Sequence, residues 1–190
     1  MARIIGGAAK GRRLKAPSGE VTRPTAARVR QSLFDILAPE IPGSRFLDAF
    51  AGTGAVGLEA LSRGAAKVVL VDRNGAAVET ARENARALAG EGGSVQVFRQ
   101  DARTAIVALA EQGFRFDLVF LDPPYASDLY EPLLSLLDEG PLLAEDGLVV
   151  AEHFHKRALP ETIGTLGRTR LVRAGDHCLS FYRRRAAAAR

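Results

Sequence analysis

Short apolar runs alternate with amphipathic segments along most of the chain, and this alternation limits the fold more than any other feature. The runs at 67–71 and 116–121 consist mainly of Val, Leu and Phe. Strands that are buried on both faces have this continuous apolar pattern, whereas half-exposed strands alternate apolar and polar residues. Helical segments between consecutive strands carry the chain back to start the next parallel strand. The sequence therefore predicts an α/β fold with helices on both faces of a mostly parallel sheet.

The predicted elements give a seven-stranded sheet. A helix capped by Thr25 is expected to run to Leu37. The last two strands are expected to pair antiparallel around the turn Ala174-Gly175-Asp176. We expect strands at 45–49, 67–71, 95–98, 116–121, 148–152, 166–173 and 178–183, and helices at 55–63, 76–89, 102–112 and 129–137.

Composition and cysteine content exclude several classes of protein. Hydrophobic residues make up 47% of the 190 residues, which is enough for a core and too much for a disordered chain. No apolar run is long enough to cross a bilayer, and the start lacks the apolar stretch of a signal peptide. The single cysteine, Cys178, has no internal partner for a disulfide, which is typical of the cytoplasm. We expect a cytoplasmic, monomeric protein without a membrane segment.

The histidines and the carboxyl terminus carry weaker signals. His153 and His155 would lie on one face of a strand, and two rings so placed can bind a metal. His177 is the only other histidine and there is no cysteine cluster, so we expect surface histidines and no metal. His153 could instead border a substrate pocket. The Arg- and Ala-rich end, 183–190, is expected to be a frayed terminus.

Basic residues are concentrated at the amino end. The first 30 residues hold eight basic side chains and one acid, Glu20, a net charge of +7 in a chain whose total is +4. Such a segment attracts phosphate groups, so we predict a basic β-hairpin extension at 1–22 that contacts RNA, followed by a catalytic domain at 23–190. A solvated arm without a partner is the alternative, and Arg28 and Arg30 could instead pair with surface carboxylates. The predicted RNA-binding residues are Arg3, Lys10, Arg12, Arg13, Lys15, Arg23, Arg28 and Arg30.

A glycine-rich loop follows the first strand of the body. Gly52, Gly54 and Gly57 match the G-x-G-x-x-G pattern that lets a cofactor approach the backbone at a helix start. Asp72, after the second strand, could accept the ribose hydroxyls of either a nicotinamide cofactor or S-adenosylmethionine. Asp48 favours S-adenosylmethionine, because a carboxylate suits its ammonium and would repel a pyrophosphate.

A third acid, Asp101, stands after the next strand. It could accept a hydrogen bond from an adenine amino group or cap the following helix. The predicted cofactor-binding residues are Asp48, Ala49, Gly52, Gly54, Asp72, Arg73, Asp101 and Ala102.

The tetrapeptide Asp122-Pro123-Pro124-Tyr125 follows the fourth strand. Its prolines stiffen the loop and remove two N–H donors while leaving their carbonyls as acceptors. The Asp122 carboxylate and the Pro123 carbonyl could each accept one N–H of a planar amino group, and Tyr125 could stack on the base that carries it. This arrangement would aim the nitrogen lone pair at a methyl group, which is most of what an in-line transfer requires. We therefore predict that Asp122, Pro123, Pro124 and Tyr125 form the catalytic loop.

These motifs resemble known families. The order of a glycine loop preceded by Asp48 and a later Asp-Pro-Pro-Tyr tetrapeptide is similar to that in class I amino-methyltransferases. The segments 3–7, 10–12, 23–25, 28–34, 47–54, 57–60 and 120–125 together resemble the RsmD family over nearly the whole chain. That resemblance implies a Rossmann-like fold, S-adenosyl-L-methionine as cofactor, and methylation of N2 of guanine 966 of 16S rRNA in the small ribosomal subunit. It also implies that the strand-end acids and glycines contact the cofactor and that the tetrapeptide contacts the guanine.

Three alternative functions remain open from the residues alone. The tetrapeptide does not distinguish guanine N2 from adenine N6 or cytosine N4, in RNA or DNA. The glycines allow an NAD-binding oxidoreductase, although that function leaves Asp48 and the tetrapeptide unexplained. An RNA-binding assembly factor without catalysis is the third alternative, and the intact Asp122 and Tyr125 oppose it.

Overall fold

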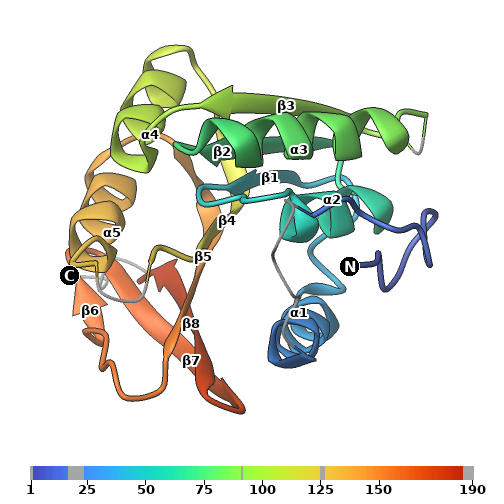
Figure 1. Cartoon of the computed structure of the whole chain (residues 1–190). Coiled ribbons are helices and arrows are strands. Elements are labelled where there is room, and N and C mark those ends of the chain that lie inside the picture. The colour runs from blue at the N-terminus through green and yellow to red at the C-terminus, as the bar shows by residue number, and fades with distance from the viewer. Residues whose placement is uncertain (1, 17–23, 91, 125–126, 186–190) are drawn as a thin grey trace.

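In a computed structural model of the chain, residues 2–16, 24–90, 92–124 and 127–185 are described, the side chains of 24–26 excepted. The elements are α1 (Pro24–Leu37), β1 (Arg45–Asp48), α2 (Ala55–Ser62), β2 (Lys67–Asp72), α3 (Gly75–Ala87), β3 (Ser94–Arg99), α4 (Ala102–Glu111), β4 (Phe116–Leu121), α5 (Tyr130–Glu139), β5 (Leu143–Phe154), β6 (Thr162–Ile163), β7 (Leu166–Ala174) and β8 (His177–Arg184). The strands form one sheet in the order β3-β2-β1-β4-β5-β8-β7-β6 (Figure 1).

The sheet confirms the predicted α/β architecture. Strands β1 to β5 are parallel, and β8 pairs antiparallel with both β5 and β7. The strand order reverses between β1 and β4, because β1 has β2 on one side and β4 on the other. In open sheets of this kind, ligands bind outside the carboxyl ends of the strands at this switch point.

Some expected boundaries differ from those observed. The two-residue strand β6 is an eighth strand that the sequence pattern did not indicate. Strand β5 begins at Leu143, five residues before the expected start, because its first residues pair with β4 across an irregularity in the register. Helix α1 begins at Pro24, so Thr25 lies inside it and does not cap it. Proline is well suited to a first helical position, since it lacks only an N–H that would have no partner there.

Two hydrophobic clusters cover the two faces of the sheet. On one face, residues of α1, α2 and α3 pack against alternate strand residues such as Phe120 and Val150. On the other face, α4 and α5 pack against the intervening residues, such as Leu121 and Ala151. Because side chains alternate along a strand, each strand side chain belongs to one face or the other, and this includes the polar side chains at the strand ends. No helix within the described ranges is long and apolar enough to cross a membrane.

Residues 2–16 pack against the body of the protein. The expected hairpin is reduced to one antiparallel bridge between Arg3 and Arg13, supported by hydrogen bonds such as that from the Ile4 amide to the Arg12 carbonyl (3.0 Å). Ile4 and Leu14 are buried in the same hydrophobic cluster as α1 and α2. The basic side chains of this segment are therefore carried on a backbone that is fixed to the domain.

A buried carboxylate fastens this segment. Glu59, in α2, is 0% exposed and accepts hydrogen bonds from the amides of Ile5 and Gly6, both at 2.7 Å. Arg63, the residue that follows the last turn of α2, pairs with the same carboxylate at 2.8 Å. Charged acceptors make the stronger protein hydrogen bonds, and a buried carboxylate needs such partners.

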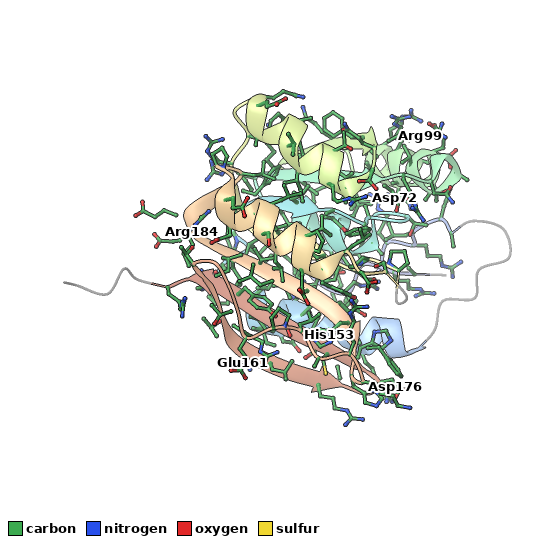
Figure 2. All side chains as sticks on the ribbon, turned by 90° about the vertical axis from the view of Figure 1, so that its left-hand side faces the viewer. Asp72, Arg99, His153, Glu161, Asp176 and Arg184 are labelled. Carbon is green, nitrogen blue, oxygen red and sulfur yellow. The ribbon has the colours of Figure 1, made fainter. Side chains whose placement is uncertain are left out.

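The carboxyl end is ordered further than expected. Strand β8 continues to Arg184, whose guanidinium donates to carbonyls at the end of α5, including those of Leu137 and Asp138 at 3.1 Å. Arg183 bonds Glu40 and the Asp146 carbonyl. The prediction of a frayed end from residue 183 is thus wrong for these two arginines, because they satisfy helix-end and loop carbonyls that would otherwise lack donors. Arg184 lies on the opposite side of the molecule from Asp72 (Figure 2).

Replacing Glu59 by Gln should loosen residues 2–16 from the domain. The amide keeps the shape but offers one acceptor where two amides and Arg63 donate, so buried donors lose their partners. We expect the free energy of unfolding in urea to fall by about 2 kcal/mol. Proteolysis within the first 16 residues should become faster. Glu111→Gln, on the exposed end of α4, is the matched control and should change neither measurement. Equal stability of the two variants would contradict the role given to Glu59.

Candidate functional site

Three carboxylates gather at the carboxyl ends of adjacent strands. Asp48 is the last residue of β1 and pairs in register with Phe120, two residues before Asp122. Leu121 pairs with Ala151, so Asp122 and Glu152 follow at the same level of β4 and β5. Since side chains alternate along a strand, all three carboxylates project toward the face covered by α1 to α3. Their meeting point is the switch point of the sheet.

Burial makes the charged state of these carboxylates unfavourable. Burial raises the pKa of Asp48 to about 7, and nearby Asp122 and Asp72 add to the rise while the Gly57 and Phe50 amides oppose it. Burial also raises the pKa of Asp122. The pKa of Glu152 is raised by burial and then by Asp122 and Asp48. A cluster of this kind favours a cationic or N–H-donating ligand, which would stabilise the ionised forms.

Hydrogen bonds to Asp48 and Asp72 fix the conformation of the glycine loop. The Gly57 amide donates to Asp48 Oδ2 at 3.2 Å, and the Gly52 amide donates to Asp72 Oδ2 at 2.8 Å. A side chain at Gly57 would bring a Cβ within 2.3 Å of Leu70, so only glycine lets α2 approach β2 this closely. Gly54 precedes α2 with a φ of 84°, in the left-handed region that favours glycine.

A pocket of about 470 Å³ opens beside this loop. Most of the predicted cofactor and catalytic positions line it, whereas Asp48, Gly52 and Gly54 do not. The pocket is also lined by four residues that were not predicted: Phe50, Gln100, Ser127 and Leu129. Phe50 lies between Asp48 and Gly52 and could have been inferred from that position. The predicted residues that line the pocket are Ala49, Asp72, Arg73, Asp101, Ala102, Asp122, Pro123 and Pro124.

Two of the acids on the pocket wall already accept backbone hydrogen bonds. Asp72 Oδ1 accepts from the Asn74 amide at 2.8 Å. Asp101 caps α4 by accepting from the Arg103 amide at 3.0 Å, which is the structural alternative that the sequence left open. Each carboxylate has further lone pairs, so capping and ligand binding are compatible.

The proline loop presents acceptors at the pocket. The Pro124 carbonyl accepts from the Ser127 amide at 2.8 Å, whereas that of Pro123 accepts from none of the described residues. Pro123 is buried and Pro124 is exposed. The predicted stacking residue Tyr125 lies outside the described residues, as does Arg23 of the basic set.

The other predicted RNA-binding residues divide into two groups. Arg3, Lys10, Arg12, Arg13, Lys15 and Arg28 are exposed. Arg30 is only 9% exposed and donates to the Arg3 carbonyl at 2.8 Å. This placement makes Arg30 a support for the amino-terminal segment and removes it from the surface expected to meet RNA.

The histidines correct one expectation. His153 is 2% exposed and its Nε2 lies 2.9 Å from Ser180 Oγ, so it belongs to the interior and not to the surface (Figure 2). His177 Nδ1 lies 2.8 Å from Glu152 Oε1. Among the described residues, no three His, Cys, Asp or Glu side chains are grouped so that they could hold a metal ion.

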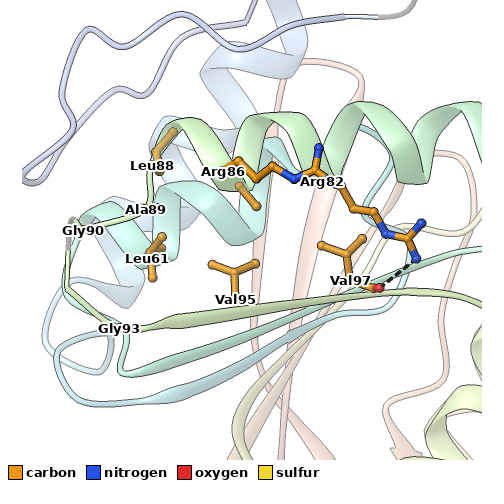
Figure 3. A pocket seen from close by; sticks show the side chains of 10 residues that line it. Leu61, Arg82, Arg86, Leu88, Ala89, Gly90, Gly93, Val95 and Val97 are labelled. Carbon is orange, nitrogen blue, oxygen red and sulfur yellow. Dashed lines mark hydrogen bonds between the residues drawn. The ribbon is translucent and has the colours of Figure 1, made fainter.

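A second hollow, of about 420 Å³, lies between α3 and the edge strand β3 (Figure 3). Its wall includes Leu61, Val95 and the stems of Arg82 and Arg86, and Arg82 reaches the Val97 carbonyl at 3.4 Å. None of the predicted site residues lines it, so it is separate from the carboxylate cluster.

The parallel sheet, the glycine loop and the strand-end acids define a class I, Rossmann-like methyltransferase fold. The chain belongs to the family described as Conserved hypothetical protein 95, the RsmD family, whose pattern matches residues 2–183. It is 37% identical over 184 residues to Ribosomal RNA small subunit methyltransferase D of Escherichia coli (strain K12), with 97% of this chain and 90% of that protein covered. It is 43% identical over 183 residues to YlbH of Bacillus subtilis (strain 168), with 96% and 99% covered.

Solved structures show the same fold. The structure of yhhF from Escherichia coli has a TM-score of 0.84 at 37% identity and covers 98% of this chain and 99% of its own. The Thermus thermophilus 16S rRNA N2 G1207 methyltransferase, in complex with AdoMet and guanosine, has a TM-score of 0.72 at 23% identity over 97% of this chain and 49% of its own. At that identity the second structure supports the fold alone. The family, fold and enzyme class expected from the sequence are thereby confirmed.

The raised pKa of Asp48 predicts how stability varies with pH. The folded state keeps a proton on Asp48 up to about pH 7, whereas the unfolded chain releases it near its ordinary pKa of 3.8. Stability is therefore lost as pH rises through this window. Asp48→Asn removes the ionisation. In the ligand-free protein, the free energy of unfolding of this variant minus that of the parent should therefore rise by about 1 to 4 kcal/mol as the pH is raised from about 5 to about 8.

Urea unfolding at several pH values measures this difference. Asp146→Asn, on an exposed stretch of β5, is the control and should follow the parent at every pH. If the free energy of unfolding of the parent and of Asp48→Asn changed with pH in parallel, burial would not raise the pKa of Asp48.

Proposed function

We propose that the protein transfers a methyl group from S-adenosyl-L-methionine to N2 of guanine 966 of 16S rRNA, in the assembled or assembling small subunit. The observation that carries this proposal is the half-buried carboxyl of Asp122 on the wall of the pocket, at the switch point of a sheet built as in methyltransferases. The family's relatives are named rRNA methyltransferases of the small subunit, which supports rRNA as substrate. In this proposal the enzyme acts as a monomer in the cytoplasm.

The residues around the pocket fit S-adenosyl-L-methionine. Asp48 directly precedes Ala49 and Phe50 on the pocket wall, and its Oδ1 is buried without a hydrogen-bond partner among the described residues, so its charge would attract an ammonium bound beside them. Asp72 would accept the ribose hydroxyls and Asp101 the adenine amino group. When bound, the cofactor supplies an electrophilic methyl group on a sulfonium, whose positive charge suits the acidic surroundings.

The catalytic loop would orient the acceptor amine. Asp122 and the Pro123 carbonyl accept its two N–H bonds, which fixes the plane of the amino group and leaves its lone pair to face the methyl. Orientation of this kind contributes most where no covalent step on the protein is needed. The proton released from the alkylated nitrogen can pass to Asp122, whose raised pKa favours taking it.

The exposed cations of the amino-terminal segment would hold the RNA. A base in folded RNA has to be splayed out of its stack before its amino group can enter a pocket. The side chains of Arg12 and Arg13 are exposed on a backbone that is fixed to α2, so phosphate contacts there would set the position of the RNA relative to the pocket.

Asp122→Asn should reduce methyl transfer by at least about 100-fold, because the amide cannot accept both the N–H bond and the proton. Binding of S-adenosylhomocysteine, measured by calorimetry, should change little. Asp117→Asn, at the amino end of the same strand and paired with Arg45, is the matched control and should retain the activity.

Mass-spectrometric mapping of the methylated nucleotides in small-subunit rRNA reports the product. Methylation at adenine N6 or cytosine N4 would replace the guanine proposal with another amino-methyltransferase. Tight binding of NAD in place of S-adenosylhomocysteine would reject the methyltransferase mechanism.

Exchanging Arg12 and Arg13 together for Glu should weaken RNA binding and leave the binding of S-adenosylhomocysteine intact. Each lost phosphate contact should reduce the slope of log affinity against log salt by about 1. Arg115→Glu, near the amino ends of the strands, is the control. This design is preferable to deleting residues 1–20, since the deletion would also remove the buried Ile4 and Leu14. An unchanged salt slope would exclude this segment as the RNA contact.

A further inference from the structure

We propose that Glu152 determines which base is accepted, by taking the N1–H of the target guanine beside the amino group held by Asp122. This inference rests on the proposed function and extends it to a residue outside the glycine loop and the proline loop. It identifies how the enzyme would select guanine over adenine and cytosine, which the tetrapeptide cannot do.

The register of the sheet places Glu152 beside Asp122, on the side away from the predicted cofactor residues Asp72 and Asp101. The pocket extends from Asp122 toward Asp72 and Asp101, over the ends of β1 to β3. Glu152 belongs to β5, the neighbour of β4 on the opposite side, and follows the Leu121–Ala151 pair at the level of Asp122. With the nucleoside of the cofactor on one side of Asp122, a base that presents its amino group to Asp122 has to lie on the side of Glu152.

Two contacts fix the position of Glu152. Its Oε1 lies 2.8 Å from Nδ1 of His177, which stands on the same face in the adjacent strand β8. Its backbone carbonyl accepts a hydrogen bond from the Tyr130 hydroxyl at 2.8 Å. The side chain is 13% exposed, so it can reach a ligand without being a solvated surface group.

The surroundings of Glu152 favour a ligand that donates an N–H hydrogen bond to its carboxyl group. The pKa of this carboxyl is raised by burial and by the neighbouring acids Asp122 and Asp48. A single imidazole contact leaves other lone pairs of the carboxylate to be satisfied. An N–H donor from a base would stabilise the ionised form, much as the ammonium of the cofactor would stabilise Asp48.

The edges of the three bases differ at the atom next to the amino group. In guanine, N1–H lies beside the N2 amino group, so two adjacent donors face Asp122 and Glu152. In adenine the atom beside the N6 amino group is an unprotonated N1, and in cytosine the atom beside N4 is an unprotonated N3. Either lone pair would face an oxygen of ionised Glu152, and two acceptors that face each other with no proton between them are strongly disfavoured. Protonated Glu152, whose pKa is raised to about 8, could donate to that lone pair, so it is the ionised form that selects guanine.

The test uses 2,6-diaminopurine, which keeps the N2 amino group of guanine and lacks N1–H. Small subunits are assembled with rRNA that carries either guanine or 2,6-diaminopurine at the target position, and single-turnover methylation of each is measured above about pH 8, where Glu152 is ionised. The parent enzyme should methylate guanine faster by about 10- to 100-fold. In Glu152→Gln the amide can donate to the bare N1, so this ratio should fall to about one or below.

Two further variants complete the experiment. Glu152→Asp keeps a carboxylate but withdraws it by one methylene, so it should slow the methylation of guanine while the preference for guanine remains. Glu111→Gln, on the exposed end of α4, should retain both rate and ratio. If Glu152→Gln does not fold, the ratio for the parent and for Glu152→Asp still tests the proposal.

The outcomes separate this inference from the proposed function. A parent enzyme that transfers no methyl to guanine would reject the proposed function itself. A parent ratio near one, or a Glu152→Gln variant that slows both bases equally and keeps the parent ratio, would overturn the role of Glu152 alone. The latter result would mean that Glu152 only positions His177.

Discussion

The clustering of one buried and two half-buried carboxyl groups at one point of the sheet is the constraint from which the character of the site follows. Asp48, Asp122 and Glu152 lie on the same face, at or near the carboxyl ends of three adjacent strands, and burial raises the pKa of each carboxyl. A fold selected for stability alone would place apolar side chains there, because each of these groups costs free energy in the empty site. The cost is offset only when a ligand brings positive charge or N–H donors. The sulfonium and ammonium of the proposed cofactor and the donor edge of guanine have this chemistry.

The basic segment is coupled to the same site through the backbone. Asn84, in α3, accepts from the Lys15 amide and donates to the Lys15 carbonyl, and it also donates to the carbonyl of Thr53 in the glycine loop. Glu59 and Ser62 of α2 hold the segment closer to its start. The helix that follows the glycine loop therefore carries both the Gly57 amide, which donates to Asp48, and the anchor of the cationic segment. RNA held by that segment would be positioned relative to the pocket by buried hydrogen bonds and not by a flexible linker.

Much of the fold was predictable because its causes are local. The apolar strands such as β4, the helices between them and the antiparallel pair β7–β8 follow from periodicity and turn residues. What failed depends on partners that are distant in the chain. Arg184 is ordered because it meets the end of α5, and the interior position of His153 is set by its pairing with β8. The same holds for Arg30. Its place in a basic stretch of sequence predicts an exposed cation, but it is buried because the amino-terminal segment packs against it.

The candidate site shows the same division. Asp48, Asp72 and Asp122 were predictable, since each ends an apolar strand beside a recognisable glycine or proline loop. Glu152 lies near the end of β5, but it is followed by no such motif, and its importance depends on the register between β4 and β5. A shift of that register by one residue would turn its side chain to the face of α4 and α5, away from Asp122. The pairing of Leu121 with Ala151, which is set by apolar packing on the opposite face of the sheet, therefore decides which carboxylates would meet the substrate.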